Sequence, residues 1–88
     1  MSSPRVLVVD DEPQIRRALR VGLINHGYQV QVAASGEEAL DLAASAPPDV
    51  VILDVAMPGL TGLEVCKELR QWSQVPIIIL SARGQERD

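Results

Sequence analysis

The sequence predicts an α/β fold, a doubly wound parallel sheet with helices on both faces. Three runs, 6–9, 50–53 and 77–80, contain only valine, leucine and isoleucine. Uninterrupted apolar runs of this length are typical of parallel strands that are buried on both faces. Segments with helical spacing lie between them, and a charged or hydroxyl residue follows each run. Alternation of such strands with helices predicts a parallel sheet.

Length and composition indicate one small globular domain. The chain has 88 residues, a net charge of -4 and a single cysteine, Cys66. The negative charge disfavours nucleic-acid binding by this segment alone. One cysteine permits no disulfide within the chain, as in a reducing cytoplasm, and no apolar run reaches the length of a membrane span. We therefore expect a cytoplasmic protein.

The first strand, 6–9, is followed by Asp10-Asp11-Glu12 and by Pro13, a favourable first residue of a helix. The spacing predicts a helix that ends at Gly27, where glycine permits a left-handed conformation. Arg16, Arg17 and Arg20 are expected to face outward. The residues expected to face the sheet are Ile15, Ala18, Leu19, Gly22 and Leu23.

Residues 28–34 alternate between apolar and polar, which predicts a strand with an exposed face, at the edge of the sheet. Two helices then begin with the Ser/Thr-x-x-Glu pattern of a capping box, at Ser35 and at Thr61. The predicted order is therefore β-α-β-α-β-α-β.

The last predicted strand, 77–80, reads Ile-Ile-Ile-Leu and needs cover on its outer edge. No residues remain in the sequence to provide a further strand. We therefore expect residues 1–88 to be a domain that is incomplete at its C-terminus. An uncovered edge of this kind can pair with another copy, so a homodimer through edge-strand pairing or swapping is also expected.

Polar residues follow three of the strands: Asp10 and Asp11, then Asp54, then Ser81. If the first strand lies beside the third, the carboxylates converge at one end of the sheet, where open α/β sheets bind ligands. Converging carboxylates repel one another unless they are protonated or bind a cation, and Mg²⁺ prefers such oxygen ligands. The site would then offer a carboxylate nucleophile for phosphoryl transfer. Taken singly, each residue has a simpler explanation as a helix cap, a turn residue or a loop hydroxyl.

Three motifs resemble the receiver domain of bacterial two-component response regulators. They are Val8-Val-Asp-Asp-Glu12, Leu53-Asp-Val-Ala-Met-Pro-Gly59 with Gly62, and Leu80-Ser-Ala-Arg83. The resemblance implies a flavodoxin-like fold with strand order 2-1-3-4, and without the family's fifth strand and last helices.

The resemblance also implies roles for individual residues. Asp54 would accept a phosphoryl group from a sensor histidine kinase, and the Ser81 hydroxyl would act as the switch that reorients towards it. Asp10, Asp11, Asp54 and the backbone carbonyl of Ala56 would hold Mg²⁺. The chain would be a signalling phosphoacceptor and not an enzyme.

The segments 70–73 and 80–88 further resemble regulators with a winged-helix DNA-binding domain, among them regulators of potassium transport. The parent protein would then contact DNA only through that output domain and would control transcription. The family's fifth-strand lysine has no counterpart here, because the single lysine, Lys67, lies in the third predicted helix.

Three alternatives remain open at this point. An Asp-nucleophile phosphohydrolase needs a second aspartate two residues after the nucleophile, and Ala56 stands there. A mononucleotide-binding domain needs a phosphate-cradling turn after the first strand, and Asp-Asp-Glu-Pro would repel phosphate. A receiver-like interaction module that is never phosphorylated is the third.

Overall fold

The computed structural model describes residues 3–55, 57, 59 and 61–80. Their elements follow the predicted order. The strands are β1 (Arg5–Val9), β2 (Gln29–Ala33), β3 (Val50–Asp54) and β4 (Ile77–Leu80), and the helices are α1 (Pro13–Asn25), α2 (Gly36–Ser45) and α3 (Gly62–Arg70). No helix in these residues is long and apolar enough to cross a membrane.

The four strands form one parallel sheet in the order β2-β1-β3-β4, as predicted. In the register, Val9 at the end of β1 faces Ala33 of β2 and Leu53 of β3. The strand predicted to be at an edge, β2, is at an edge. Because β1 and β3 are neighbours, the residues that follow Val9 and Leu53 come together at the same end of the sheet.

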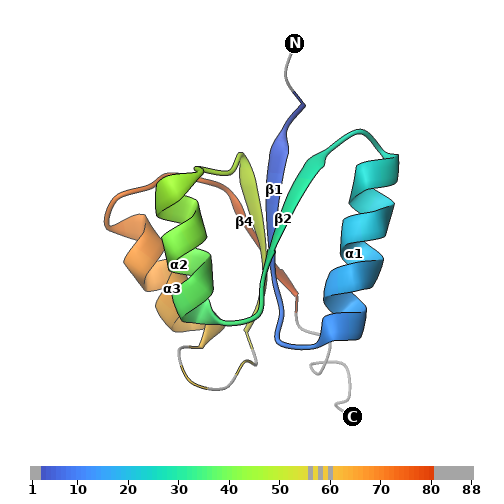
Figure 1. Cartoon of the computed structure of the whole chain (residues 1–88). Coiled ribbons are helices and arrows are strands. Elements are labelled where there is room, and N and C mark those ends of the chain that lie inside the picture. Colours follow the sequence, from blue (N-terminus) through green and yellow to red (C-terminus); the bar gives the residue numbers. More distant parts are fainter. Residues whose placement is uncertain (1–2, 56, 58, 60, 81–88) are drawn as a thin grey trace.

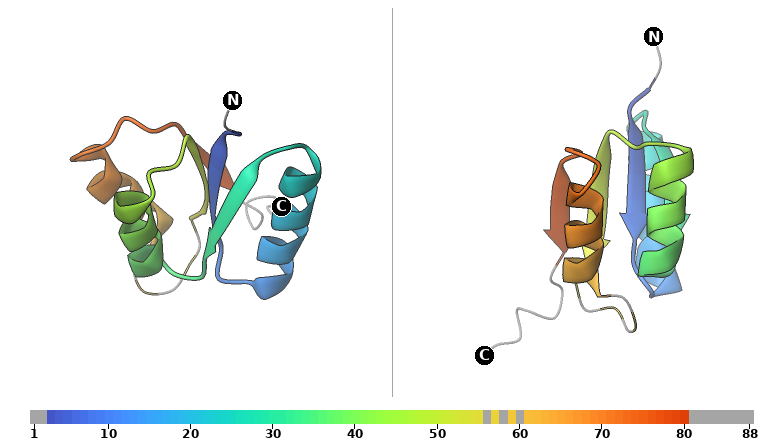
Figure 2. Two further views of the ribbon diagram at one scale, coloured as in Figure 1. Left: turned by 45° about the horizontal axis from the view of Figure 1, so that its top comes forward. Right: turned by 90° about the vertical axis from the view of Figure 1, so that its left-hand side faces the viewer.

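Helices lie on both faces of the sheet, with α1 on one side and α2 and α3 on the other (Figures 1 and 2). The face towards α2 and α3 carries the continuous core, in which aliphatic side chains of β1 and β3 pack against those of the two helices. Its largest fully buried members are Leu7, Val9, Val51, Leu53, Val65 and Leu69. Close packing of aliphatic residues thus holds β3 in place.

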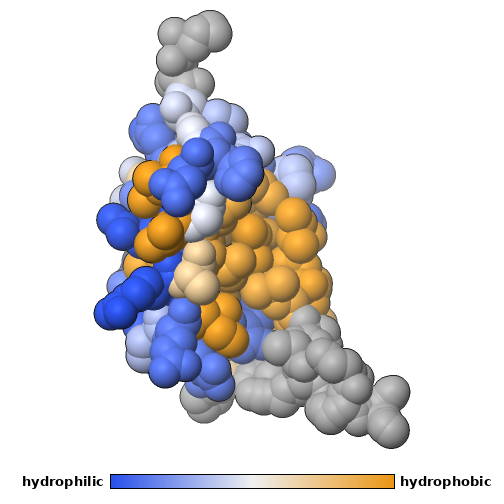
Figure 3. Space-filling model, turned by 90° about the vertical axis from the view of Figure 1, so that its right-hand side faces the viewer, coloured by the Kyte–Doolittle hydropathy of each residue, from blue (hydrophilic) through white to orange (hydrophobic). Residues whose placement is uncertain are grey.

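The opposite face is less well covered. Helix α1 packs on β2 and β1, and Val6 and Val8 are buried beneath it. On the same face of β4, Ile78 is 53% exposed. Figure 3, a view from the α1 side, shows a broad patch of apolar side chains.

This partial cover corrects the predicted inner face of α1. Ile15, Leu19 and Leu23 are half-buried, but Ala18 and Gly22 are exposed. No residue of α1 is fully buried. The helical spacing was right, while the number of residues in contact with the sheet was overestimated.

Local hydrogen bonds start and end the helices largely as predicted. The capping box at Thr61 is complete. Thr61 Oγ1 accepts a hydrogen bond from the Glu64 amide at 3.3 Å, and the Thr61 amide donates one to Glu64 Oε1 at 2.8 Å. The box at Ser35 is incomplete. Ser35 Oγ accepts a hydrogen bond from the Glu38 amide at 3.1 Å, but Glu38 Oε1 accepts its hydrogen bond from the Ala34 amide instead of the Ser35 amide. Gly27 follows α1 with a φ of 92°. These caps fix where α2 and α3 begin. The start of α3 matters for function, because it packs against the end of β3.

Candidate functional site

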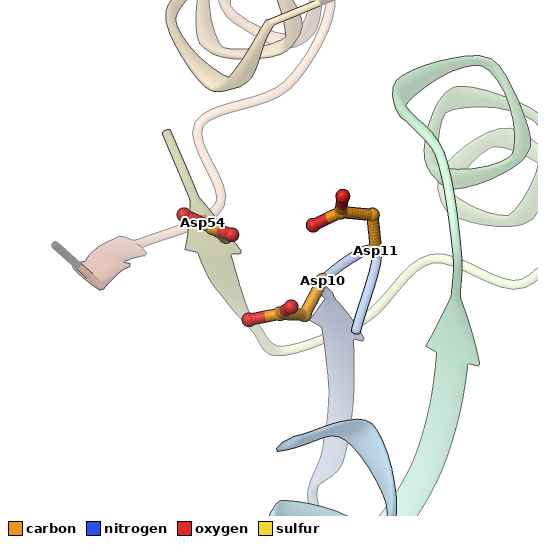
Figure 4. Close-up of side chains that lie close together, drawn as sticks. All are labelled: Asp10, Asp11 and Asp54. Carbon is orange, nitrogen blue, oxygen red and sulfur yellow. The ribbon is translucent and has the colours of Figure 1, made fainter. Parts of the chain in front are cut away.

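Three aspartates meet at the carboxyl ends of β1 and β3. Asp54 is the last residue of β3, while Asp10 and Asp11 follow β1 directly. Figure 4 shows their side chains directed towards a common space. One carboxylate oxygen from each residue can be chosen so that all three lie within 4.8 Å of one another. The convergence expected from the sequence is therefore present, and it follows from the pairing of β1 with β3.

Two of these carboxylates are buried. Asp10 is 2% exposed and Asp54 is 8% exposed. The Asp10 Oδ1 atom accepts a hydrogen bond from the Glu12 amide at 2.9 Å, and the Asp10 amide donates to the Ala33 carbonyl at 3.1 Å. Asp10 is thus held on both sides, by its own turn and by β2. The simpler explanation of Asp10 as the cap of α1 is wrong, since Glu12 occupies the N-cap position.

Burial and neighbouring charge act together on Asp10. Loss of hydration raises the pKa of the Asp10 carboxyl, and the negative charges of Asp54, Asp11 and Glu12 raise it further. The hydrogen bond from the Glu12 amide opposes both effects. The sequence suggested repulsion between carboxylates as the main cause, but burial is the larger one.

Asp11 supplies an independent indication of a missing partner. Its Oδ1 atom is buried and has no hydrogen-bond partner among the described residues. A buried carboxylate oxygen without a partner is costly, because it loses hydration and gains nothing in return. A hard divalent cation would satisfy it, and Mg²⁺ binds readily to one or two carboxylates plus waters. The donor set and the unsatisfied oxygen therefore fit a magnesium site.

The start of α3 lies against the end of β3. A Cβ atom on Gly62 would lie 2.5 Å from Val55 Cα and 2.6 Å from the Asp54 carbonyl oxygen. Only glycine permits so close an approach of the two backbones. The sequence marked Gly62 merely as part of a motif, and its steric role was missed because it depends on a contact across the fold.

Two residues assigned to the site from the sequence, Ala56 and Ser81, lie outside the described residues. Within the described ones, Asp10, Asp11 and Asp54 form the candidate site. The arrangement offers a carboxylate nucleophile beside two further acids that suit a cation.

Comparison with known proteins identifies the family. Residues 6–88 match the family model described as the response regulator receiver domain. The chain belongs to this family. Its sheet order and acidic cluster are those expected of a receiver domain, and the family consists of signalling phosphoacceptors rather than enzymes. The phosphohydrolase and mononucleotide-binding alternatives are thereby set aside.

Curated relatives of this receiver domain include transcriptional regulators. The transcriptional regulatory protein KdpE of Mycobacterium tuberculosis is 54% identical over 83 residues, which cover 94% of this chain and 37% of KdpE. The response regulator MprA of Mycolicibacterium vanbaalenii is 54% identical over 80 residues, covering 90% of this chain and 35% of MprA. The receiver domain thus spans little more than a third of these relatives.

Solved structures agree with the fold. The response regulator TrrA of Thermotoga maritima, in complex with Mg²⁺ and BeF, has a TM-score of 0.86 and 46% identity over 99% of this chain and 75% of TrrA. TrrA in complex with the histidine kinase ThkA gives a TM-score of 0.84 at 46% identity, over 100% of this chain and 75% of TrrA. The flavodoxin-like receiver fold is therefore shared with experimentally determined structures.

Proposed function

We propose that Asp54 is the phosphoacceptor of this receiver domain and that a sensor histidine kinase is the donor. The observation that carries the proposal is the convergence of its carboxylate with those of Asp10 and Asp11 at the ends of β1 and β3. Open α/β sheets bind ligands at the carboxyl ends of their strands, which is where Asp54 lies, and the core holds the backbone of β3 in place. TrrA, a relative in fold and sequence, has been captured with its kinase ThkA.

In the proposed transfer, an Asp54 carboxylate oxygen attacks the phosphorus of a phosphohistidine. The new phosphorus–oxygen bond forms as the phosphorus–nitrogen bond breaks, and the leaving imidazole nitrogen keeps the bonding electron pair and takes up a proton. The product on this chain is an acyl phosphate. Two neighbouring carboxylates would oppose the approach of a phosphoryl group, so their charge has to be neutralised.

Asp10, Asp11, Asp54 and the backbone carbonyl of Ala56 would hold the Mg²⁺ ion. The buried, unsatisfied Oδ1 of Asp11 supports this assignment. When bound, the ion supplies positive charge to the carboxylates and to the phosphoryl oxygens. The TrrA complex with Mg²⁺ and BeF is a precedent in a relative.

The remaining roles concern residues and partners beyond the described site. The Ser81 hydroxyl would donate a hydrogen bond to a phosphoryl oxygen and so act as the switch. By analogy with KdpE, a transcriptional regulatory protein, the parent protein would act on transcription. It would do so through a DNA-binding output domain and in the cytoplasm, as expected from the sequence. Copies of this chain would associate through the outer edge of β4, where Ile78 and Ile79 are exposed.

The test is an intact-mass measurement after incubation with a small acyl phosphate, with and without Mg²⁺. One phosphoryl group is expected in the presence of Mg²⁺, and none in Asp54→Asn. Asp41→Asn is a matched control, because Asp41 is an exposed residue of α2. Absence of an adduct in folded wild-type protein would instead favour the interaction module that is never phosphorylated.

A further inference from the structure

A second, basic site lies between α1 and β2. An open pocket of about 240 Å³ is lined by Pro13, Arg16, Arg17, Arg20 and Val32. It contains none of the three aspartates of the acidic site. Three of the eight basic residues of the chain therefore surround a single pocket, in a protein whose net charge is -4.

These three guanidinium groups lack a negative partner in the described part of the chain. Their only polar contact there joins Arg16 Nη1 to the Asp10 carbonyl oxygen, at 2.8 Å. Arg20 follows Arg16 by four positions and Arg17 by three, so the three charges are neighbours on the helix surface. Like charges at these spacings destabilise a helix. Their common placement around a pocket thus concentrates positive charge, which a bound anion would neutralise.

The geometry favours one class of anion. A guanidinium group presents a planar fork of donors that matches the oxygens of carboxylates and phosphates. A phosphate dianion offers more oxygens and more charge than a single carboxylate, and so can engage several forks together. The hydrogen bond to Asp10 holds Arg16 in place, which reduces the conformational entropy that it loses on binding. Pro13 and Val32 add an apolar wall beside the charges.

We propose that this arginine pocket binds the phosphate group of a small molecule, either inorganic phosphate or a nucleotide. The pocket is smaller than a typical drug-sized site, which suits a single phosphate group better than an extended chain. This binding would be independent of phosphoryl transfer to Asp54.

The experiment is an NMR titration of the isotope-labelled 88-residue chain with inorganic phosphate, in buffer free of divalent cations and at constant ionic strength. Without a divalent cation, the acidic site repels phosphate, so a saturable shift reports on another site. Saturable changes are expected at the Arg16, Arg17 and Arg20 side chains. The double variant Arg17→Gln/Arg20→Gln should bind at least about tenfold more weakly, because hydrogen bonds to charged groups are lost.

The matched control is Lys67→Gln/Arg70→Gln, which removes the same charge from α3. It should bind phosphate as the wild type does. Glutamine is a good helix former, so both variants should keep their helices, and Arg20→Gln alone serves if the double variant is unfolded. Equal loss in both double variants, equal binding in all proteins, or shifts that never saturate would each overturn the proposal.

A parallel titration with adenosine monophosphate distinguishes the two sources of phosphate. Tighter binding than inorganic phosphate would assign a nucleotide that also contacts Pro13 and Val32. Equal affinity would assign the phosphate group alone. The Asp54→Asn variant should bind in the same way as wild type, which separates this site from the phosphoacceptor.

Discussion

Gly62 is in backbone contact with Asp54. Its missing side chain leaves room for the Asp54 carbonyl oxygen, which would lie 2.6 Å from a Cβ atom. The backbones of the first residue of α3 and the last residue of β3 are therefore packed too closely to admit a side chain between them. Because Asp54 carries the proposed phosphoacceptor carboxylate, any residue larger than glycine at position 62 should disturb both stability and the site.

Gly62→Ala should lower the free energy of unfolding by about 1–3 kcal/mol, the usual cost of forcing extra atoms into a packed region. The atoms in the way are backbone atoms of Asp54 and Val55, which cannot rotate aside. Urea denaturation measures the change, and the phosphorylation assay should show a parallel loss.

Gly22→Ala is the matched control in another helix. A Cβ at Gly22 meets no atom within 4 Å, so alanine should stabilise α1 by up to about 1 kcal/mol through its helix propensity. If Gly62→Ala proved as harmless as Gly22→Ala, the tight contact between α3 and β3 would be disproved.

Asp10→Asn should change how stability depends on pH. The folded state raises the pKa of Asp10 above its ordinary value of 3.8. Below pH 3.8 the carboxyl is neutral in both states. As pH rises from 3.8 through the raised pKa, the unfolded chain ionises more readily, and the contribution of Asp10 to stability is lost.

Asparagine keeps an oxygen that can accept the Glu12 amide but does not ionise. Metal-free Asp10→Asn should therefore gain stability relative to wild type across that pH range, by at most about 1.4 kcal/mol for each pH unit. Thermal unfolding at a series of pH values measures the difference. A constant difference at all pH values would mean that Asp10 titrates normally in the folded protein.

Asp11→Asn should weaken Mg²⁺ binding while leaving metal-free stability unchanged or improved. The reason is that Asp11 Oδ1 is buried without a hydrogen-bond partner among the described residues, so its negative charge brings no benefit until a cation binds. The increase in melting temperature caused by Mg²⁺ measures the binding, since a ligand stabilises the folded state by mass action. Asp41→Asn should retain the full increase, and an undiminished increase in Asp11→Asn would remove Asp11 from the metal site.

Thr61→Ala should destabilise the fold by about 1 kcal/mol, because it removes the hydroxyl that accepts the Glu64 amide at the start of α3. Thr61→Ser keeps that hydroxyl and should retain most of the stability. Chemical denaturation of the two variants side by side provides the measurement. Similar losses in both would show that the methyl group of Thr61, and not the cap, is what matters.

Much of the candidate site was predictable because its residues follow strands that are obvious in the sequence. Uninterrupted apolar runs place Asp10 and Asp11 directly after β1 and Asp54 at the end of β3, and parallel pairing brings such ends together. What the sequence could not rank was the cause of the raised pKa of Asp10, because the extent of burial depends on how loops and strands close over the carboxyl group.

The arginine pocket shows the complementary case. From the helical spacing, Arg16, Arg17 and Arg20 were expected only to face outward. Their position beside Val32 of β2 arises from the packing of α1 on the sheet, which joins residues distant in sequence. The overestimated inner face of α1 has the same origin, since helical spacing gives a direction but not the extent of the neighbouring surface.

The order of strands and helices, the helix starts and the acids at the ends of β1 and β3 could all be predicted from the sequence alone. These features depend on local periodicity and on hydrogen bonds between residues close in the chain. Three features depend on the tertiary structure: the backbone contact of Gly62 with Asp54, the buried Asp11 oxygen that has no partner among the described residues, and the pocket between α1 and β2. Each of these depends on distances between segments remote in sequence, which are set when the sheet and helices pack together.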